Sequence, residues 1–351
     1  MERKYSIIVP VFNRPDEVQE LLESLTKQTE TGFEVIIVED GSTVPCEEVC
    51  KKYRASLNIR YFKKENSGPG ESRNYGAERA SGEYLIILDS DVILPETYIA
   101  SVSRELQENP CDAFGGADAS HPSFTPIQKA ISYSMTSFFT TGGIRGGKKK
   151  LDKFYPRSYN MGIRREVYKE LGGFSRMRFG EDIDFSYRIV EAGYKTMLFP
   201  SAWVWHKRRT DFRKFWRQVY NSGIARINLE KRHPGTMKLV HLLPTVFTIG
   251  VGVLFAISFT GRMLMVYGPG PAPIHRWYWL CAAPWLPILL YCLLIFIDSS
   301  IVNRSMGIGI RSIAAAFTQL MGYGCGFLYA WWQRCVLRKD EFHAFDKTFY
   351  K

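Results

Sequence analysis

Residues 84–91 have the sequence YLIILDSD, in which an apolar run ends in two carboxylates at alternate positions. A short apolar run bounded by polar residues is typical of a buried β-strand. A second acidic pair, Glu181-Asp182, opens a helical pattern directly after Phe179-Gly180. Unpaired charges are costly to bury, whereas carboxylates bind hard divalent cations and can act as general bases. The two pairs therefore predict a site for a charged, phosphate-bearing substrate.

Strand and helix patterns alternate through the first ninety residues. The helix-start signal at 13–16 is followed by apolar residues at helical spacing over 18–25. Strands that alternate with helices imply a doubly wound, mostly parallel α/β sheet, which binds ligands at the carboxyl ends of its strands. The predicted strands are Tyr5–Val9, Glu34–Val38, Ile59–Phe62 and Tyr84–Leu88.

Seven short motifs occur in order along the first half of the chain. They are SIIVPVFN (6–13), VEDGS (38–42), GPGESRN (68–74), DSD (89–91), NMG (160–162), GGF (172–174) and GED (180–182). Family 2 glycosyltransferases carry such motifs in this order, and the chain resembles that family over about residues 4–225. The resemblance implies a GT-A fold, which is a Rossmann-like nucleotide-sugar domain, and sugar transfer with inversion.

The resemblance assigns the nucleotide to the ends of the first two strands. Asp40 matches the aspartate that accepts a hydrogen bond from the uracil N3–H, and Pro10, Val11 and Asn13 match the wall beside base and ribose. The structural alternatives are a turn at Asp40 and a helix cap at Asn13. Glu39 departs from the more usual aspartate, which leaves its own role open.

Arg73 and Asn74 lie on the first turns of the helix that follows the Gly-Pro-Gly turn at 68–70. The resemblance implies that both lie near the nucleotide and the metal-binding carboxylates. An ion pair between Arg73 and a neighbouring acid is the alternative for that residue.

The resemblance also implies a metal site for Mg²⁺ or Mn²⁺. Asp91 is the expected metal ligand, and Asp89 with Ser90 is expected beside the ribose or sugar of the donor. His206 lies where many family members carry a histidine that completes the metal site. A solvated acidic turn at 89–91 and a structural histidine are the alternatives.

Asp182 is the candidate general base, because inverting transfer needs a carboxylate that takes the proton of the acceptor hydroxyl. Glu181 is expected to orient the acceptor or the loop. Acids at a helix N-terminus also stabilise the helix dipole, which is the alternative for both residues.

The net charge of +11 is concentrated before a series of apolar segments. Ten Lys and Arg residues lie between 203 and 238, and uncharged segments follow at 242–261, 277–297 and 312–333. Each has about the length that crosses a hydrocarbon core. The basic residues are therefore expected to face anionic lipid, and nucleic acid is not an expected partner.

The expected organisation is a catalytic domain (1–225), a basic juxtamembrane segment (226–240), a membrane region of about three helices (241–334) and a tail (335–351). The apolar run after Lys4 is too short for a signal peptide, so the catalytic domain is expected in the cytoplasm of a multi-pass membrane protein. Three spans would place the basic tail outside. One segment is alternatively re-entrant or interfacial.

The predicted function is metal-dependent transfer of a sugar from a UDP-linked donor to a lipid-linked or glycolipid acceptor in cell-surface polysaccharide or glycolipid synthesis. Alternatives are a polyisoprenyl-phosphate glycosyltransferase and a non-catalytic membrane scaffold. A processive synthase is disfavoured, because residues 215–220 read FWRQVY and lack the Gln-x-x-Arg-Trp order. The segment GGIRGGKKK (142–150) is interpreted either as a lid or as a solvated loop.

Overall fold

The computed structural model describes residues 4–119, 121, 123–141, 154–207, 209–267 and 281–345. The chain forms two compact units, the first from residues 1–122 and 146–207 and the second from residues 123–145 and 208–351. The segment 142–150, predicted as a lid or a solvated loop, lies outside the described residues.

The first unit is built on an eight-stranded mixed sheet with the order β3-β2-β1-β4-β7-β6-β8-β5. Strands β3, β2, β1 and β4 are mutually parallel, which confirms the four predicted strands and the mostly parallel α/β class. Strand β7 runs antiparallel to both of its neighbours, β4 and β6. The strands are β1 (Tyr5–Val11), β2 (Phe33–Asp40), β3 (Ile59–Lys64), β4 (Tyr84–Leu88), β5 (Val92–Ile93), β6 (Ala113–Ala119), β7 (Asn160–Arg164) and β8 (Thr196–His206).

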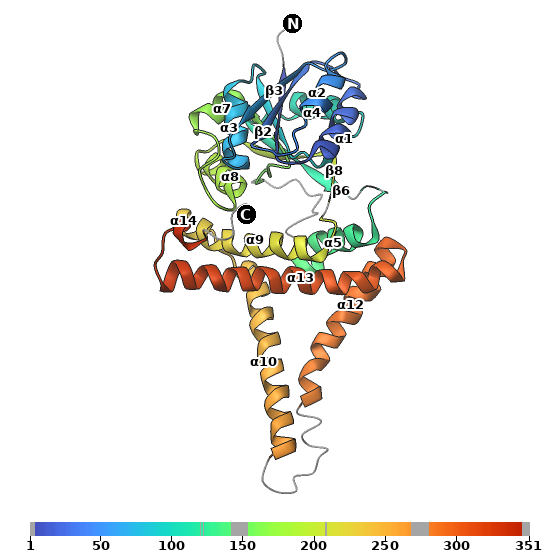
Figure 1. Ribbon diagram of the computed structural model, residues 1–351, viewed down its shortest axis with the longest axis vertical. Helices are drawn as coiled ribbons and strands as arrows, with labels where there is room; N and C mark the ends of the chain where they lie inside the picture. The colour runs from blue at the N-terminus through green and yellow to red at the C-terminus, as the bar shows by residue number, and fades with distance from the viewer. Residues whose placement is uncertain are drawn as a thin grey trace. The chain divides into compact units, whose positions relative to one another are not determined.

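Helices cover both faces of this sheet, because the central strands are apolar on both sides. Ile7 and Val9 of β1 point into a core shared with α1, α2 and α4, while Ile8 points into a second core shared with α3, α7 and α8. Figure 1 shows several of these helices against the sheet. The helices are α1 (Pro15–Thr26), α2 (Glu47–Tyr53), α3 (Pro69–Glu78), α4 (Tyr98–Glu108), α7 (Arg165–Glu170) and α8 (Glu181–Glu191).

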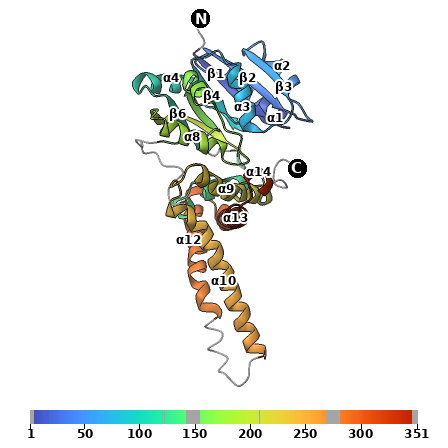
Figure 2. The same ribbon diagram turned by 90° about the vertical axis from the view of Figure 1, so that its left-hand side faces the viewer.

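The second unit is helical. Its long helix α13 lies along α9 and α5, and α10 and α12 project from that layer side by side (Figures 1 and 2). The elements are α5 (Pro126–Thr136), α6 (Phe138–Thr141), α9 (Phe212–Arg232), α10 (Leu239–Tyr267), the 3-10 turn η1 (Ala283–Trp285), α12 (Leu286–Asn303), α13 (Met306–Trp331), the π-helical turn η2 (Trp332–Val336) and α14 (Glu341–Ala344).

Glycines allow α9 and α13 to approach backbone to backbone. A Cβ atom on Gly223 of α9 would lie 2.2 Å from the carbonyl oxygen of Tyr323, and one on Gly326 would lie 2.0 Å from that of Tyr220. Such contacts exclude any side chain at these two positions. The close packing ties α13 to α9 along much of its length.

Two helical segments are long and apolar enough to cross a membrane, Leu239–Tyr267 and Ala283–Asn303. The first contains the predicted span 242–261, and the second overlaps the predicted span 277–297 from residue 283 onward. The third, 312–333, lies mainly in α13, which is not one of these helices in the described part of the chain. Many of its apolar residues, among them Ala315 and Phe327, are buried against neighbouring helices, whereas Trp331 and Trp332 at its end are exposed.

Candidate active site

The two predicted metal ligands, Asp91 and His206, meet Asp89, predicted beside the donor sugar, at the ends of β4 and β8. Asp89 and Asp91 follow β4, and His206 ends β8, which pairs with β5 just beyond Asp91. One ligand atom from each residue lies within 4.8 Å of the others, and the His206 Nε2 atom is 3.3 Å from the Asp91 Oδ1 atom. Two carboxylates and an imidazole form a donor set that suits Mn²⁺, and Mg²⁺ through the carboxylates. The residues therefore fit the predicted cation.

Three neighbours of this cluster were not predicted from the sequence. The Arg14 Nη1 atom donates to the Asp91 Oδ2 atom at 2.7 Å, and the Asp118 Oδ2 atom lies 3.8 Å from the His206 Nδ1 atom. The ring of Tyr159 stacks on the imidazole of His206 with the centroids 5.0 Å apart. Burial opposes the charge of Arg14, but the Asp91 carboxylate raises its pKa above the ordinary value.

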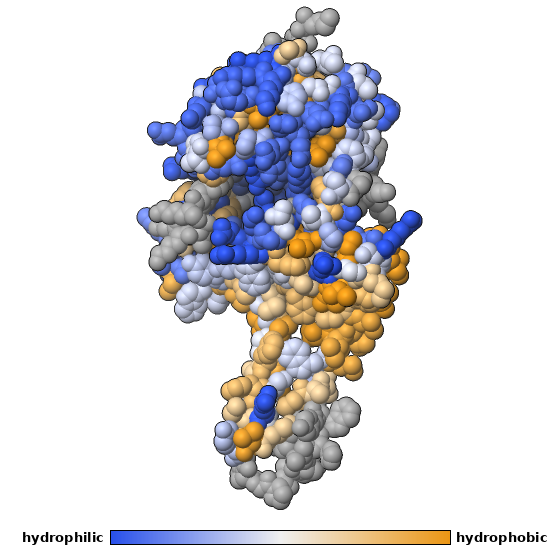
Figure 3. Space-filling model, turned by 45° about the vertical axis from the view of Figure 1, so that its right-hand side comes forward, coloured by the Kyte–Doolittle hydropathy of each residue, from blue (hydrophilic) through white to orange (hydrophobic). Residues whose placement is uncertain are grey.

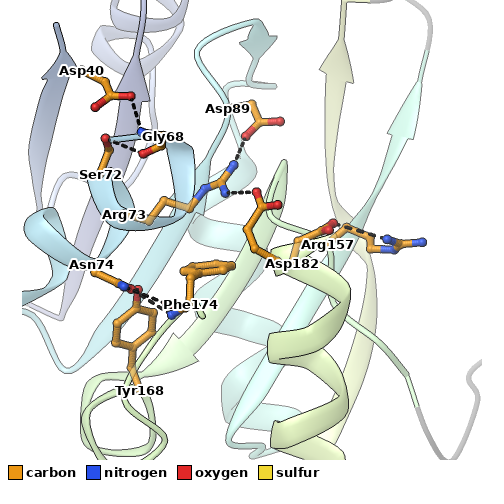
Figure 4. A network of polar contacts seen from close by, with 11 residues as sticks. Asp40, Gly68, Ser72, Arg73, Asn74, Asp89, Arg157, Tyr168, Phe174 and Asp182 are labelled. Atoms are coloured by element: carbon orange, nitrogen blue, oxygen red, sulfur yellow. Dashed lines mark hydrogen bonds and ion pairs between the residues drawn. The ribbon is translucent and has the colours of Figure 1, made fainter. Parts of the chain in front are cut away.

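Arg73 joins the two acidic pairs. Its guanidinium donates to the Asp89 Oδ1 atom at 3.0 Å and to the Glu181 Oε1 atom at 3.1 Å (Figure 4). Only 4% of the Arg73 side chain is exposed. Burial alone would lower the pKa of Arg73, but the carboxylates of Asp89 and Glu181 raise it. The ion-pair alternative for Arg73 is therefore present in the structure.

Glu181 and Asp182 begin α8 but have different arginine partners. Gly180, at φ +87°, turns the chain into this helix in a conformation that favours glycine. Burial raises the pKa of Glu181, although its pairing with Arg73 works in the opposite direction. The Asp182 Oδ2 atom instead accepts from the Arg157 Nη1 atom at 3.3 Å. Glu181 is thus engaged by the buried arginine, and Asp182 by a half-exposed one.

Asp40 lies at the carboxyl end of β2 and is 3% exposed. Its side chain accepts hydrogen bonds from the backbone amides of Ser67 and Gly68, both at 2.9 Å, and from the Lys64 ammonium. These bonds hold the turn that leads into α3. Since an ionised carboxylate has about four lone-pair sites, one acceptor position remains for a base N–H.

Several other predicted nucleotide-binding residues have their polar atoms bonded within the protein. The Asn13 Oδ1 atom accepts from the backbone amides of Thr43 and Val44, so the helix-cap interpretation of Asn13 is wrong. The carboxylate of buried Glu39 accepts from the backbone amide of Cys46 and from a nearby serine hydroxyl. The Asn74 side chain bonds to both backbone polar groups of Phe174.

The remaining predicted residues lie at the two strand ends that border the cluster. Val11 is buried at the end of β1, with Pro10 half-buried beside it. Ser90 is buried between Asp89 and Asp91. The assignment of these residues to a wall around a bound nucleotide sugar stays a prediction.

Replacement of Arg73 by glutamine should lower the free energy of unfolding by about 3–5 kcal/mol, because it leaves two carboxylates facing each other without their buried cation. Chemical denaturation of the purified protein measures this loss. The control is Arg54→Gln, since Arg54 is exposed at the end of α2 and should change stability by no more than about 0.5 kcal/mol. Equal stability of the two variants would show that Arg73 is dispensable to the fold.

A mostly parallel α/β sheet with aspartates at its strand ends and a carboxylate-histidine cluster defines a nucleotide-sugar-binding domain of the GT-A class. Residues 6–172 match the family model described as Glycosyl transferase family 2. Residues 6–172 therefore belong to glycosyltransferase family 2, as the motifs predict.

Two relatives and one solved structure illustrate the likeness. An uncharacterized glycosyltransferase of Rickettsia felis is 34% identical over 145 residues, covering 41% of this chain and 23% of the relative. The poly(ribitol-phosphate) beta-N-acetylglucosaminyltransferase TarS of Staphylococcus aureus is 35% identical over 113 residues, covering 31% and 20%. The chain thus spans less than a quarter of the length of either relative.

The fold resembles that of the mannosyltransferase PcManGT from Pyrobaculum calidifontis, solved in complex with GDP-Man and Mn²⁺. The TM-score is 0.60 at 17% sequence identity, and the match covers 91% of this chain and 88% of that one. At this identity the likeness establishes the fold alone.

Proposed function

We propose that the protein transfers a sugar, with inversion and with the help of a divalent cation, from a nucleotide-diphosphate donor to a membrane-anchored acceptor. The observation that carries this proposal is the arrangement around Arg73. Arg73 bonds to Asp89 of the candidate metal-binding cluster and to Glu181, which precedes the candidate general base Asp182 at the start of α8 (Figure 4). An inverting transferase needs these two functions on opposite sides of the reacting sugar carbon.

The residues divide the chemistry as follows. Asp91 and His206 would hold the cation, which neutralises the diphosphate and stabilises charge on the departing nucleotide. Asp182 takes the proton of the acceptor hydroxyl as its oxygen attacks the anomeric carbon. Glu181, held by Arg73, keeps the first turn of α8 in place. Arg157 pairs with Asp182, so this ion pair must open or shift when the acceptor hydroxyl binds.

The donor is proposed to be UDP-linked, because Asp40 has one acceptor position for the uracil N3–H. Thermal unfolding with UDP, GDP and CDP, each with Mn²⁺, tests this assignment. A ligand that binds only the folded state at 100 times its dissociation constant stabilises by about 2.7 kcal/mol. UDP should raise the melting temperature most. A larger shift with GDP would contradict the uridine assignment and leave the rest of the proposal standing.

The membrane-anchored acceptor is supported by the surface of the second unit. Helices α10 and α12 expose a band of large apolar side chains, more than a soluble surface carries, and orange atoms cover much of the lower half of Figure 3. Twenty uncharged residues in α10 span about 30 Å, which matches a hydrocarbon core. Exposed side chains in the band include Leu243, Val246, Ile249, Val253, Phe255 and Phe259 of α10 and Leu286, Leu289, Leu290 and Leu293 of α12.

The two helices are proposed to form a hairpin that crosses the membrane and returns, while α13 lies in the plane of the membrane surface. The chain would then enter and leave the membrane on the same side, so the exposed basic residues of α9 and the basic tail would both lie on that side. The positive-inside rule makes it the cytoplasmic side. Three spans would place the basic tail outside, against the positive-inside rule, whereas the hairpin places it inside. The exposed basic residues are Arg213, Lys214, Arg217, Lys231 and Arg232 of α9 and Arg338 and Lys339 of the tail.

Cysteine labelling distinguishes the two topologies. Tyr267 ends α10 and is 79% exposed, and Cys335 is exposed just after α13. Two variants of the full chain each carry a single cysteine, either the native Cys335 or Tyr267→Cys. A membrane-impermeant maleimide should label these two sites from opposite sides of sealed vesicles. Labelling from the same side would mean that α13 also crosses. If each site is labelled from both sides and alkali extracts the protein from the vesicles, a membrane-spanning hairpin is ruled out.

Donor hydrolysis and transfer assays separate the remaining alternatives. A non-catalytic scaffold would release no nucleotide under any condition. A polyisoprenyl-phosphate glycosyltransferase would release it with a lipid phosphate alone, whereas the proposed enzyme would need a lipid-linked saccharide or a glycolipid. EDTA should abolish release in either enzyme.

A further inference from the structure

The imidazole of His206 lies between two carboxylates. Its Nε2 atom faces Asp91, and its Nδ1 atom is 3.8 Å from the Asp118 Oδ2 atom, a separation in the range of an ion pair rather than a hydrogen bond. The side chains of His206 and Asp118 are 15% and 17% exposed, so water screens their interaction only partly. A histidine that binds a metal through one ring nitrogen commonly directs the other toward a carboxylate.

The sheet brings Asp118 to this position through an irregular register. Between the pairs Gly116–Phe199 and Asp118–Val204, β6 advances by two residues while β8 advances by five. The extra residues of β8 form a bulge, a feature that redirects side chains near functional sites. Beyond it, Asp118 lies opposite Val204, and His206 is two residues further along β8 on the same face. A regular register would not align Asp118 with the end of β8.

Tyr159 restrains the same ring from its face. The phenol and imidazole rings are stacked, with 22° between their planes, and the Tyr159 hydroxyl donates to the carbonyl oxygen of Gly116 at 3.3 Å. The stacked ring limits rotation of the imidazole, while Asp118 favours the tautomer that carries its proton on Nδ1. That tautomer leaves the Nε2 lone pair directed toward Asp91 and a cation held there.

We infer that Asp118 is a positioning residue for the metal site, which sets the tautomer and orientation of His206 without binding the cation itself. This inference rests on the metal dependence of the proposed function. Sequence patterns offer no signal for Asp118, because it lies in the second half of the sheet outside the seven motifs.

The test measures Mn²⁺ affinity of the full chain without nucleotide, from the paramagnetic resonance signal of free Mn²⁺. Asp118→Ala should weaken binding by about 10–100-fold, the usual effect of removing such a partner. Asp118→Asn should lose less, because its amide oxygen can still place a partial negative charge beside the Nδ1–H group. The control is Asp112→Asn, since Asp112 precedes the same strand and bonds to Lys195 and Arg164, away from His206. It should bind Mn²⁺ like the unmodified protein.

A double-mutant cycle shows whether Asp118 acts through His206. In a His206→Ala background, Asp118→Ala should cause no further loss of Mn²⁺ affinity, because the ring that it positions is gone. An undiminished loss in that background, or unchanged affinity of Asp118→Ala alone, would overturn the inference. Failure of the unmodified protein to bind Mn²⁺ would instead overturn the metal dependence on which the inference rests.

Discussion

The Asp182→Asn protein is expected to bind its nucleotide-sugar donor normally and to transfer sugar about 10²–10⁴ times more slowly, the usual contribution of a general base. Donor binding should survive because Asp40, Asp89 and Asp91 lie at the ends of β2 and β4, whereas Asp182 begins α8. The substitution removes a charge from a half-exposed side chain and keeps its shape. Donor affinity and transfer rate should be measured on one preparation.

The competing explanation for Asp182 is a favourable charge at the N-terminus of α8. Loss of that charge costs only about 0.3–1 kcal/mol of stability and leaves the chemistry intact. Near-normal transfer by Asp182→Asn would therefore remove Asp182 from the mechanism and make Glu181 the next carboxylate to test. The matched variant Glu181→Gln should lose less transfer than Asp182→Asn, because Arg73 already engages the Glu181 carboxylate.

Asp91→Asn is expected to lower metal-dependent transfer by about 10³-fold or more. A divalent cation contributes several kcal/mol to the stabilisation of the departing diphosphate, and 1.36 kcal/mol corresponds to a factor of ten in rate. The loss should appear together with weaker Mn²⁺ binding. The fold should persist, because asparagine keeps the shape of this side chain and its partner Arg14 is about one-third exposed.

The control for Asp91→Asn is Asp16→Asn. Asp16 lies in the first turn of α1 and is exposed, so its neutralisation should leave Mn²⁺ binding and transfer unchanged. Full transfer by the unmodified protein in EDTA, or by the Asp91→Asn protein in Mn²⁺, would show that no cation at this aspartate takes part.

The three long apolar segments show what amino-acid composition alone can predict. A run of apolar residues predicts a helix with apolar surroundings, but it does not indicate whether lipid or other helices surround it. Most large apolar side chains of α10 and α12 are exposed, whereas many of those in α13 pack against neighbours in the same unit. Gly223 and Gly326 allow α13 to approach α9, a contact that depends on two segments about a hundred residues apart.

The amino-acid sequence by itself determined the strands of the first half, the family and the two acidic pairs, because apolar runs and motif order are local properties of the chain. It also predicted that Asp40, Asp89 and Asp91 lie at one edge of the sheet, since the carboxyl ends of neighbouring parallel strands meet there. Only the tertiary structure decided which groups surround these residues. Arg14 reaches Asp91, Arg157 reaches Asp182, and Asp118 reaches His206 across separations of 77, 25 and 88 positions. Such partners depend on strand order and on a bulge between β6 and β8, and no local pattern carries that information.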